Sequence, residues 1–226
     1  MNAIERFGLK SLLLAGILGL SACGSTPEVD RSRIETSERT NLMVAAAKGN
    51  VDWVEARLDK GAQVNAMSPD GTPLFLAAAN EHDTVVWTLL RQGADSDRGR
   101  PDGTTPLMAA ANAGETRIVD MLLAAGADIE AKNNNGNTAL SYAVLNSQLV
   151  VTNRLLRAGA DVNVVNKAGE SLLMRVVARN DLLLAGVIVD ADANVGYESP
   201  NGRTALDIAS ANGNRDLVMM LRNARN

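Results

Sequence analysis

The sequence predicts an all-α fold, namely a solenoid of six helix-turn-helix units. A three-residue motif recurs every 33 residues after a first step of 32. Its copies are Thr40-Asn41-Leu42, Thr72-Pro73-Leu74, Thr105-Pro106-Leu107, Thr138-Ala139-Leu140, Ser171-Leu172-Leu173 and Thr204-Ala205-Leu206. A second motif keeps the same period, as Gly61-Ala62-Gln63, Gly93-Ala94-Asp95, Gly126-Ala127-Asp128 and Gly159-Ala160-Asp161. A fixed period near 33 residues is typical of solenoids, in which each unit buries its apolar face against its neighbours.

Residues 1–22 are predicted to be a cleaved signal peptide. Arg6 and Lys10 give a positive start, and residues 12–20 form an apolar run too short to span a membrane as a mature helix. The run ends in Leu20-Ser21-Ala22-Cys23, which resembles the bacterial lipobox, whose cysteine becomes the lipidated first residue of the mature protein. Cys23 is the only cysteine, so we expect lipid attachment there. The alternative is an ordinary secretory signal with an incidental cysteine.

Residues 23–36 are predicted to be the lipidated cysteine and a polar tether, whose coil would span roughly 20 Å. Gly24 follows the cysteine, where lipoproteins kept in the inner membrane often carry aspartate. The resemblance therefore implies the periplasmic face of the cell envelope, with the outer membrane favoured over the inner. The membrane contact would be made through Cys23.

The six predicted units fill residues 37–226, at about 37–68, 69–100, 101–133, 134–166, 167–199 and 200–226. The third unit is the fullest, with Gly103-Thr104-Thr105-Pro106-Leu107 followed by an alanine run. This pattern resembles the ankyrin repeat, a pair of antiparallel helices followed by an outward loop. Proline suits the first helical turn, and Gly126 can take the left-handed conformation that ends the second helix.

Two departures from the resemblance bear on packing. The histidine usual after Thr-Pro-Leu is absent from every unit. Arg175 is the one charged residue expected at a core-facing position, where other units carry Leu76 or Tyr142. Burying it unpaired would be costly, so we expect it either to escape to solvent or to pair, with Asp207 as the candidate.

Composition and motifs argue against catalysis. The net charge is −4 and no basic stripe is present, which argues against nucleic acid. A single histidine, His82, and a single cysteine cannot build a zinc site, and the acidic stretches beginning at Asp95 and Asp190 depart from a calcium loop. No nucleophile elbow or phosphate loop occurs. We expect no enzyme, cofactor, metal or small-molecule substrate.

The resemblance implies that another protein is bound by the concave inner-helix face and the loop tips. We place the centre of the predicted site at Asn112, Leu145, Asn146 and Arg179. The other candidates are Asn80 on an inner helix and Asn134, Asn135, Asn137 and Lys167 at the tips. Amides both donate and accept hydrogen bonds, which suits a directional interface, although a merely soluble surface is the alternative.

The two tryptophans differ in register. Trp53 falls where other units carry valine, isoleucine or leucine, and is predicted to be core. Trp87 falls where other units carry residues such as Asp120, and is predicted to face outward. It would then be an interface anchor or lie flat over a neighbouring helix.

Location and fold together suggest a role by analogy. The most concrete expectation is an immunity or inhibitor protein that blocks a toxin delivered to the periplasm, for example a type VI secretion lipase. The competing expectation is an envelope scaffold or stress-related factor that organises another membrane complex.

Overall fold

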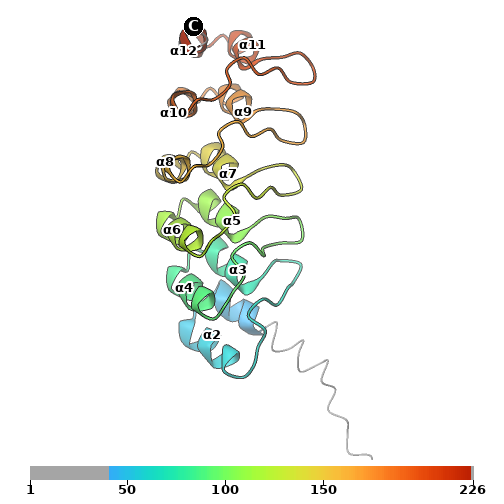
Figure 1. Ribbon diagram of the computed structural model, residues 1–226, viewed down its shortest axis with the longest axis vertical. Helices are drawn as coiled ribbons and strands as arrows, with labels where there is room; N and C mark the ends of the chain where they lie inside the picture. The colour runs from blue at the N-terminus through green and yellow to red at the C-terminus, as the bar shows by residue number, and fades with distance from the viewer. Residues whose placement is uncertain (1–40, 225–226) are drawn as a thin grey trace, which may run out of the picture. The chain divides into compact units, whose positions relative to one another are not determined.

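The computed structural model describes residues 41–224, which form a stack of paired helices (Figure 1). The pairs are residues 41–47 with α2 (Val51–Leu58), α3 (Pro73–Ala79) with α4 (Asp83–Arg91), α5 (Pro106–Ala113) with α6 (Thr116–Ala124), α7 (Ala139–Leu145) with α8 (Leu149–Arg157), α9 (Leu172–Ala178) with α10 (Leu182–Asp190), and α11 (Ala205–Ala211) with α12 (Arg215–Ala224). The predicted signal peptide, Cys23 and the tether lie outside the described residues.

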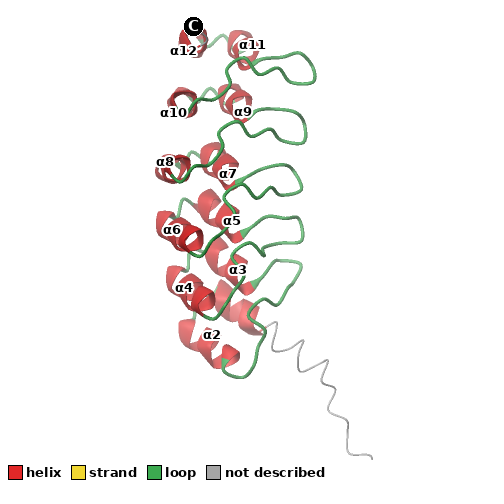
Figure 2. Ribbon diagram, viewed as in Figure 1, coloured by secondary structure: helices red, strands yellow, loops and turns green. Residues whose placement is uncertain are grey.

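Helices of like kind stack on one another along the chain. The inner helices α3, α5, α7, α9 and α11 pack in succession, and each also packs against the outer helix that follows it. No strand forms among the described residues (Figure 2), where two isolated antiparallel bridges join Ser68 to Gly71 and Val165 to Ser171. The prediction of an all-α helical solenoid is confirmed.

The recurring motif begins the inner helices α3, α5, α7, α9 and α11, and its first residue is the N-cap of each. The Thr105 hydroxyl accepts a hydrogen bond from the Met108 N–H at 3.3 Å, and the Ser171 hydroxyl accepts one from Met174 at 3.3 Å. A side-chain acceptor at this place satisfies one of the free N–H groups of the first turn. The third motif residue is core, since Leu107 and Leu140 have no exposed surface.

The turn between the two helices of a pair requires a left-handed residue in each repeat. Gly49, Gly114 and Gly213 supply it in three repeats, with φ between 69° and 86°. In the other three repeats the same place is held by Glu81 (φ 64°), Ser147 (φ 57°) and Asn180 (φ 59°). A side chain in this conformation is strained by roughly 1–2 kcal/mol.

Two substitutions test these turns in opposite directions. Gly126 ends α6 with φ 87°, and a Cβ there would meet nothing within 4 Å. Gly126→Val is expected to lower the free energy of unfolding by about 1–2 kcal/mol through backbone strain alone. Ser147→Gly is expected to raise it by roughly 0.5 kcal/mol, because relief of strain exceeds the entropic cost of glycine.

Urea denaturation of the two variants measures both effects. Each variant is the control for the other, because both substitutions lie at exposed turns and are expected to change the free energy of unfolding in opposite directions. A Gly126→Val protein as stable as the parent would contradict the left-handed assignment.

Candidate functional site

Four of the predicted binding residues lie at the carboxyl ends of consecutive inner helices. Asn80, Asn146 and Arg179 are the C-cap residues of α3, α7 and α9, and Asn112 lies in the last turn of α5. All four are exposed. We call these four residues the inner-face row.

The structure joins two members of this row directly. The Asn146 amide donates to Asn112 Oδ1 at 2.8 Å and to the Tyr142 carbonyl at 2.9 Å. The Asn80 amide donates to the Leu76 carbonyl at 2.8 Å, which is the same bond to the preceding turn. These amides are therefore held in place before any partner arrives, which lowers the entropy lost on binding.

Leu145 does not belong to the exposed row, and its prediction as an exposed contact is wrong. Its side chain is partly buried and packs against the hydrophobic core. Counted from the N-cap of the inner helix, Leu145 occupies the same repeat position as Asn112. Asn80, Asn146 and Arg179 occupy the next position, so the predicted centre combined residues from two different repeat positions.

Arg175 is held at the junction of the fourth and fifth repeats. It is partly buried, and its Nη1 donates to Asn137 Oδ1 of the preceding repeat at 2.8 Å. Burial lowers the pKa of Arg175, while the carboxylate of Glu170 acts in the opposite direction. The Asp207 carboxylate, the partner suggested by sequence, caps its own helix α11 by accepting from Thr204. Asn137 is consequently a junction residue as well as a tip candidate.

The loop tips are linked to one another through the backbone. The Asn134 N–H donates to the Asp102 carbonyl at 2.8 Å, and the Lys167 N–H donates to the Asn135 carbonyl at 3.0 Å. The side chains of Asn134, Asn135 and Lys167 are exposed. At the Asp102 tip, a hydrogen bond from the Thr104 N–H holds the pKa of the Asp102 carboxyl below its ordinary value. The tips thus present polar side chains on a pre-ordered backbone.

Asn133 and Tyr142 were missed by sequence reasoning. The Asn133 amide donates to the Tyr142 hydroxyl at 2.9 Å, while Asn133 Oδ1 accepts from the N–H groups of Asn135 and Asn137. This buried side chain therefore ties the tip to the inner helix α7. Asparagine followed by polar residues and glycine is a turn signal that could have identified it.

Comparison with known proteins agrees with the geometry. A family model described as ankyrin repeats (3 copies) matches residues 1–100 and residues 74–166. The chain belongs to the ankyrin-repeat family. Repeats of this kind form a protein-interaction module and are typically not enzymes. A search among curated proteins gave no match.

Two solved ankyrin structures are similar over most of the chain. The ankyrin repeat domain of Bcl-3, described as a unique member of the IkappaB protein family, has 29% identity and a TM-score of 0.75 over 81% of this chain and 85% of that one. An ankyrin repeat domain from Acinetobacter baumannii AYE has 26% identity and a TM-score of 0.74, over 81% of this chain and 97% of that one.

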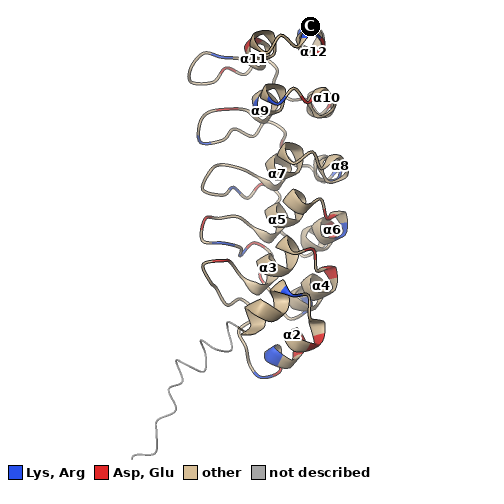
Figure 3. Cartoon of the chain, turned by 180° about the vertical axis from the view of Figure 1, so that it is seen from behind, with Lys and Arg blue, Asp and Glu red and all other residues tan. Residues whose placement is uncertain are grey.

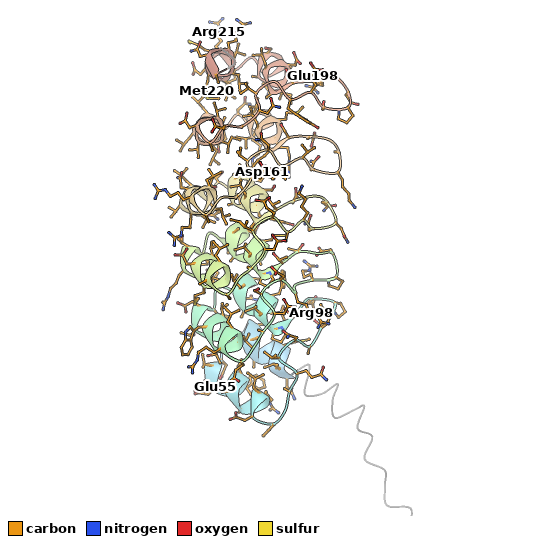
Figure 4. The ribbon with its side chains drawn as sticks, viewed as in Figure 1. Glu55, Arg98, Asp161, Glu198, Arg215 and Met220 are labelled. Carbon is orange, nitrogen blue, oxygen red and sulfur yellow. The ribbon has the colours of Figure 1, made fainter. Side chains whose placement is uncertain are left out.

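The ankyrin Gly-Ala-Asp motif leads into a ladder of hydrogen bonds between repeats. Each rung is a side-chain oxygen two residues after the motif that accepts from the backbone of the next repeat. The rungs are Asn65 to the Asp95 N–H (2.8 Å), Asp97 to Asp128 (2.8 Å), Glu130 to Asp161 (2.7 Å) and Asn163 to Asn194 (2.8 Å). Asp161 is labelled in Figure 4. The period of these side chains was visible in the sequence, but their role was not predicted.

This ladder gives the acidic stretches a structural role. The Asp95 carboxylate accepts from the Asp97 N–H at 3.0 Å, and Asp97 accepts from Asp128. Among the described residues, no group of three or more acidic, histidine or cysteine side chains is placed to hold a metal ion. His82 contacts the Ala47 carbonyl through Nε2 at 3.0 Å, which is a structural contact between the first two repeats.

On the outer helices, charged pairs link neighbouring repeats. Figure 3 shows acidic residues on α4 and both acidic and basic residues on α6. Arg117 of α6 pairs with Asp83 of α4 at 2.6 Å, and Arg154 of α8 pairs with Asp120 of α6 at 2.5 Å. No helix within residues 41–224 is both long and apolar enough to cross a membrane. Ion pairs thus cross-link the outer helices α4, α6 and α8.

Trp87 faces outward from α4, as predicted. Its side chain is 51% exposed, and the Arg91 guanidinium lies 4.4 Å from the ring centroid. It lines a small hollow of about 140 Å³ with Thr84, Arg117 and Met121, among others. It therefore lies on the same helix surface as its arginine and beside α6, and the interface anchor and the flat arrangement both stay predictions.

Trp53 is only partly buried, so its prediction as core is correct in direction but not in extent. Among the described helices, α2 packs against the outer helix α4 on one side. The equivalent residues Val85, Ile118 and Val151 lie in interior repeats and have no exposed surface. Leu217 occupies this position in the last repeat and also has no exposed surface, so a missing flanking repeat does not explain the partial exposure of Trp53.

Proposed function

We propose that this ankyrin-repeat protein is a membrane-anchored module of the periplasm that binds another protein along the inner-face row. The observation that carries the proposal is the row itself, in which exposed amides on successive helices are fixed by hydrogen bonds. Asn146 donates to Asn112, and Asn80 and Asn146 each donate to a carbonyl of their own helix. Arg179 continues the row with an exposed guanidinium that has no acidic partner among residues 41–224. Arginine is enriched at protein interfaces, and fixed amides give such an interface direction.

The most concrete form of this function is an immunity or inhibitor protein that blocks a periplasm-delivered toxin, such as a type VI secretion lipase. The support is the lipobox-like segment together with a repeat fold that presents an extended polar face. An envelope scaffold or stress-related role is the competing candidate. A secreted effector encoded next to this gene favours immunity, and an envelope-assembly locus favours the scaffold.

Affinity purification of the full chain from cell envelopes tests the function. We expect one envelope or toxin protein to co-purify in near-stoichiometric amount, and co-expression to protect cells from that toxin if it is one. Recovery of the chain without a stoichiometric protein, from cells that express the neighbouring genes, would argue against a binding role.

The anchor has its own prediction. Cys23→Ser is expected to abolish labelling with radioactive palmitate and to block processing or release the mature protein into the soluble periplasm, because Cys23 is the sole thiol. Ser25→Ala, two residues away in the predicted tether, should leave labelling and membrane fractionation unchanged. Mature Cys23→Ser protein found wholly in the membrane fraction would refute the anchor.

A further inference from the structure

The outer helix α10 is apolar on every side. Its sequence is Leu-Leu-Leu-Ala-Gly-Val-Ile-Val-Asp, and its only charged residue is the last, Asp190. In Figure 3, α10 is correspondingly almost entirely tan. A helix at the surface of a soluble repeat normally keeps one polar face. Here Leu184 and Ile188 are buried in the core, while Leu182 and Leu183 are 42% and 63% exposed.

A third exposed apolar residue lies on the neighbouring outer helix. Val150 of α8 is 68% exposed and occupies the same repeat position as Leu183, one repeat earlier. Equivalent positions in stacked repeats are neighbours. The same position carries Thr84, Arg117 and Asp216 in the second, third and sixth repeats. We call Val150, Leu182 and Leu183 the outer apolar patch.

This patch lies across the junction between the fourth and fifth repeats, where the helices pack less extensively than at the junctions on either side. Helices α8 and α10 approach each other less closely than α6 and α8 or α10 and α12 do, and α7 and α9 less closely than the inner pairs on either side. The inner side of the junction contains the partly buried Arg175 with its Asn137 partner. An added apolar element could therefore contact both α8 and α10.

Arg157 follows Val150 by seven residues and so lies on the same face of α8, about two turns away. Helices α6 and α8 carry three arginines and one aspartate, and that aspartate, Asp120, is paired with Arg154. Arg157 is exposed and has no acidic partner within residues 41–224. Together with Arg154 it lines a hollow of about 370 Å³ between the ends of α6 and α8. A guanidinium in such a place matches a carboxylate.

We propose that the outer apolar patch binds an amphipathic helix of a second protein, with apolar residues on Val150, Leu182 and Leu183 and a carboxylate on Arg157. Such a helix would bury the exposed leucines and bridge the loose junction. Asp181 and Asp190 at the two ends of α10 disfavour an anionic lipid surface, and they restrict the carboxylate of the bound helix to the end that meets Arg157. A second copy of this chain would offer mainly arginines from its own α6 and α8.

This surface is made by outer helices, whereas the inner-face row is made by inner helices, so the two proposals stand independently. Loss of binding at one surface should leave the other unaffected. The chain would then hold two proteins at once, one on each side of the stack.

The test is a binding selection in which a displayed library of 18-residue helical peptides is screened against the purified chain from residue 24 to residue 226. We expect enriched peptides with leucine, isoleucine or phenylalanine on one face and glutamate or aspartate beside it. Binding of the best synthetic peptide should fall at least tenfold for Val150→Glu with Leu183→Glu, and at least fivefold for Arg157→Glu. Thr84→Glu, at the same repeat position on α4, should bind like the parent.

Several results would overturn the proposal. One is enrichment of basic peptides. Another is binding of the best peptide to the Val150→Glu, Leu183→Glu protein as tightly as to the parent, and a third is loss of binding in Thr84→Glu as large as in that double variant. Sedimentation showing a dimer that the double substitution dissolves would assign the patch to self-association. Binding to vesicles of phosphatidylglycerol that the double substitution abolishes would assign it to the membrane. Melting of each variant, expected within a few degrees of the parent, separates loss of binding from loss of fold.

Discussion

Replacing Leu140 with alanine is expected to lower the free energy of unfolding by about 2–5 kcal/mol. Leu140 is in α7 of the fourth repeat and has no exposed surface. Interior repeats are flanked on both sides, and the inner helix α7 packs against α5, α8 and α9. The substitution removes three side-chain carbons from the contact between repeats, and the surrounding helices can close the resulting cavity only in part.

Leu206 provides the matched control. It occupies the same repeat position as Leu140, but it is in the last described repeat and only partly buried. Leu206→Ala is therefore expected to cost clearly less than Leu140→Ala, since partly exposed carbons have less transfer energy to lose. Urea denaturation of both variants measures the difference. Equal costs would mean that burial in this solenoid does not depend on flanking repeats.

The sequence predicted the features that form within a single repeat. The Thr-Pro-Leu motif predicted the helix starts because a hydroxyl cap and a proline act locally on one turn. Gly126 predicted the end of α6 because a positive φ is a local requirement. The outward direction of Trp87 followed from the helical period alone. Such features need no knowledge of the neighbouring repeat.

Features that depend on the neighbouring repeat were harder to predict. Arg175 pairs with Asn137 because the loop tip of the preceding repeat reaches over α9, which no local spacing encodes. Trp53 and Leu145 differ in burial from the residues at the same positions of other repeats, because the size of each side chain decides how much of its surface is covered. The residues of the inner-face row could be assigned to their helices from the sequence, but the hydrogen bond from Asn146 to Asn112 could not be predicted.

Reversing the charge pattern of the inner-face row is expected to abolish partner binding, and with it protection if the protein is an immunity factor. The variant is Asn146→Arg with Arg179→Glu. Both residues are exposed at the ends of inner helices, so neither substitution opens a cavity. Asn146→Arg removes the amide that orders Asn112, and Arg179→Glu places a carboxylate where the partner meets a guanidinium. Leaving a partner's buried charge unpaired costs about 2–5 kcal/mol.

That energy corresponds to a loss of affinity of roughly 30-fold or more. Leu145 is left unchanged because it packs against the core, so that an acidic residue there would confuse loss of fold with loss of binding. The matched control is Thr84→Arg with Arg91→Glu, which makes the same net charge change on exposed residues of the outer helix α4. We expect the control to bind the co-purified partner like the parent, and both proteins to melt within a few degrees of it.

If the inner-face variant bound that partner with full affinity, the partner site would lie elsewhere on the solenoid. The loop tips at Asn134, Asn135 and Lys167 would then be the next residues to substitute, because they are the other exposed polar groups on a pre-ordered backbone.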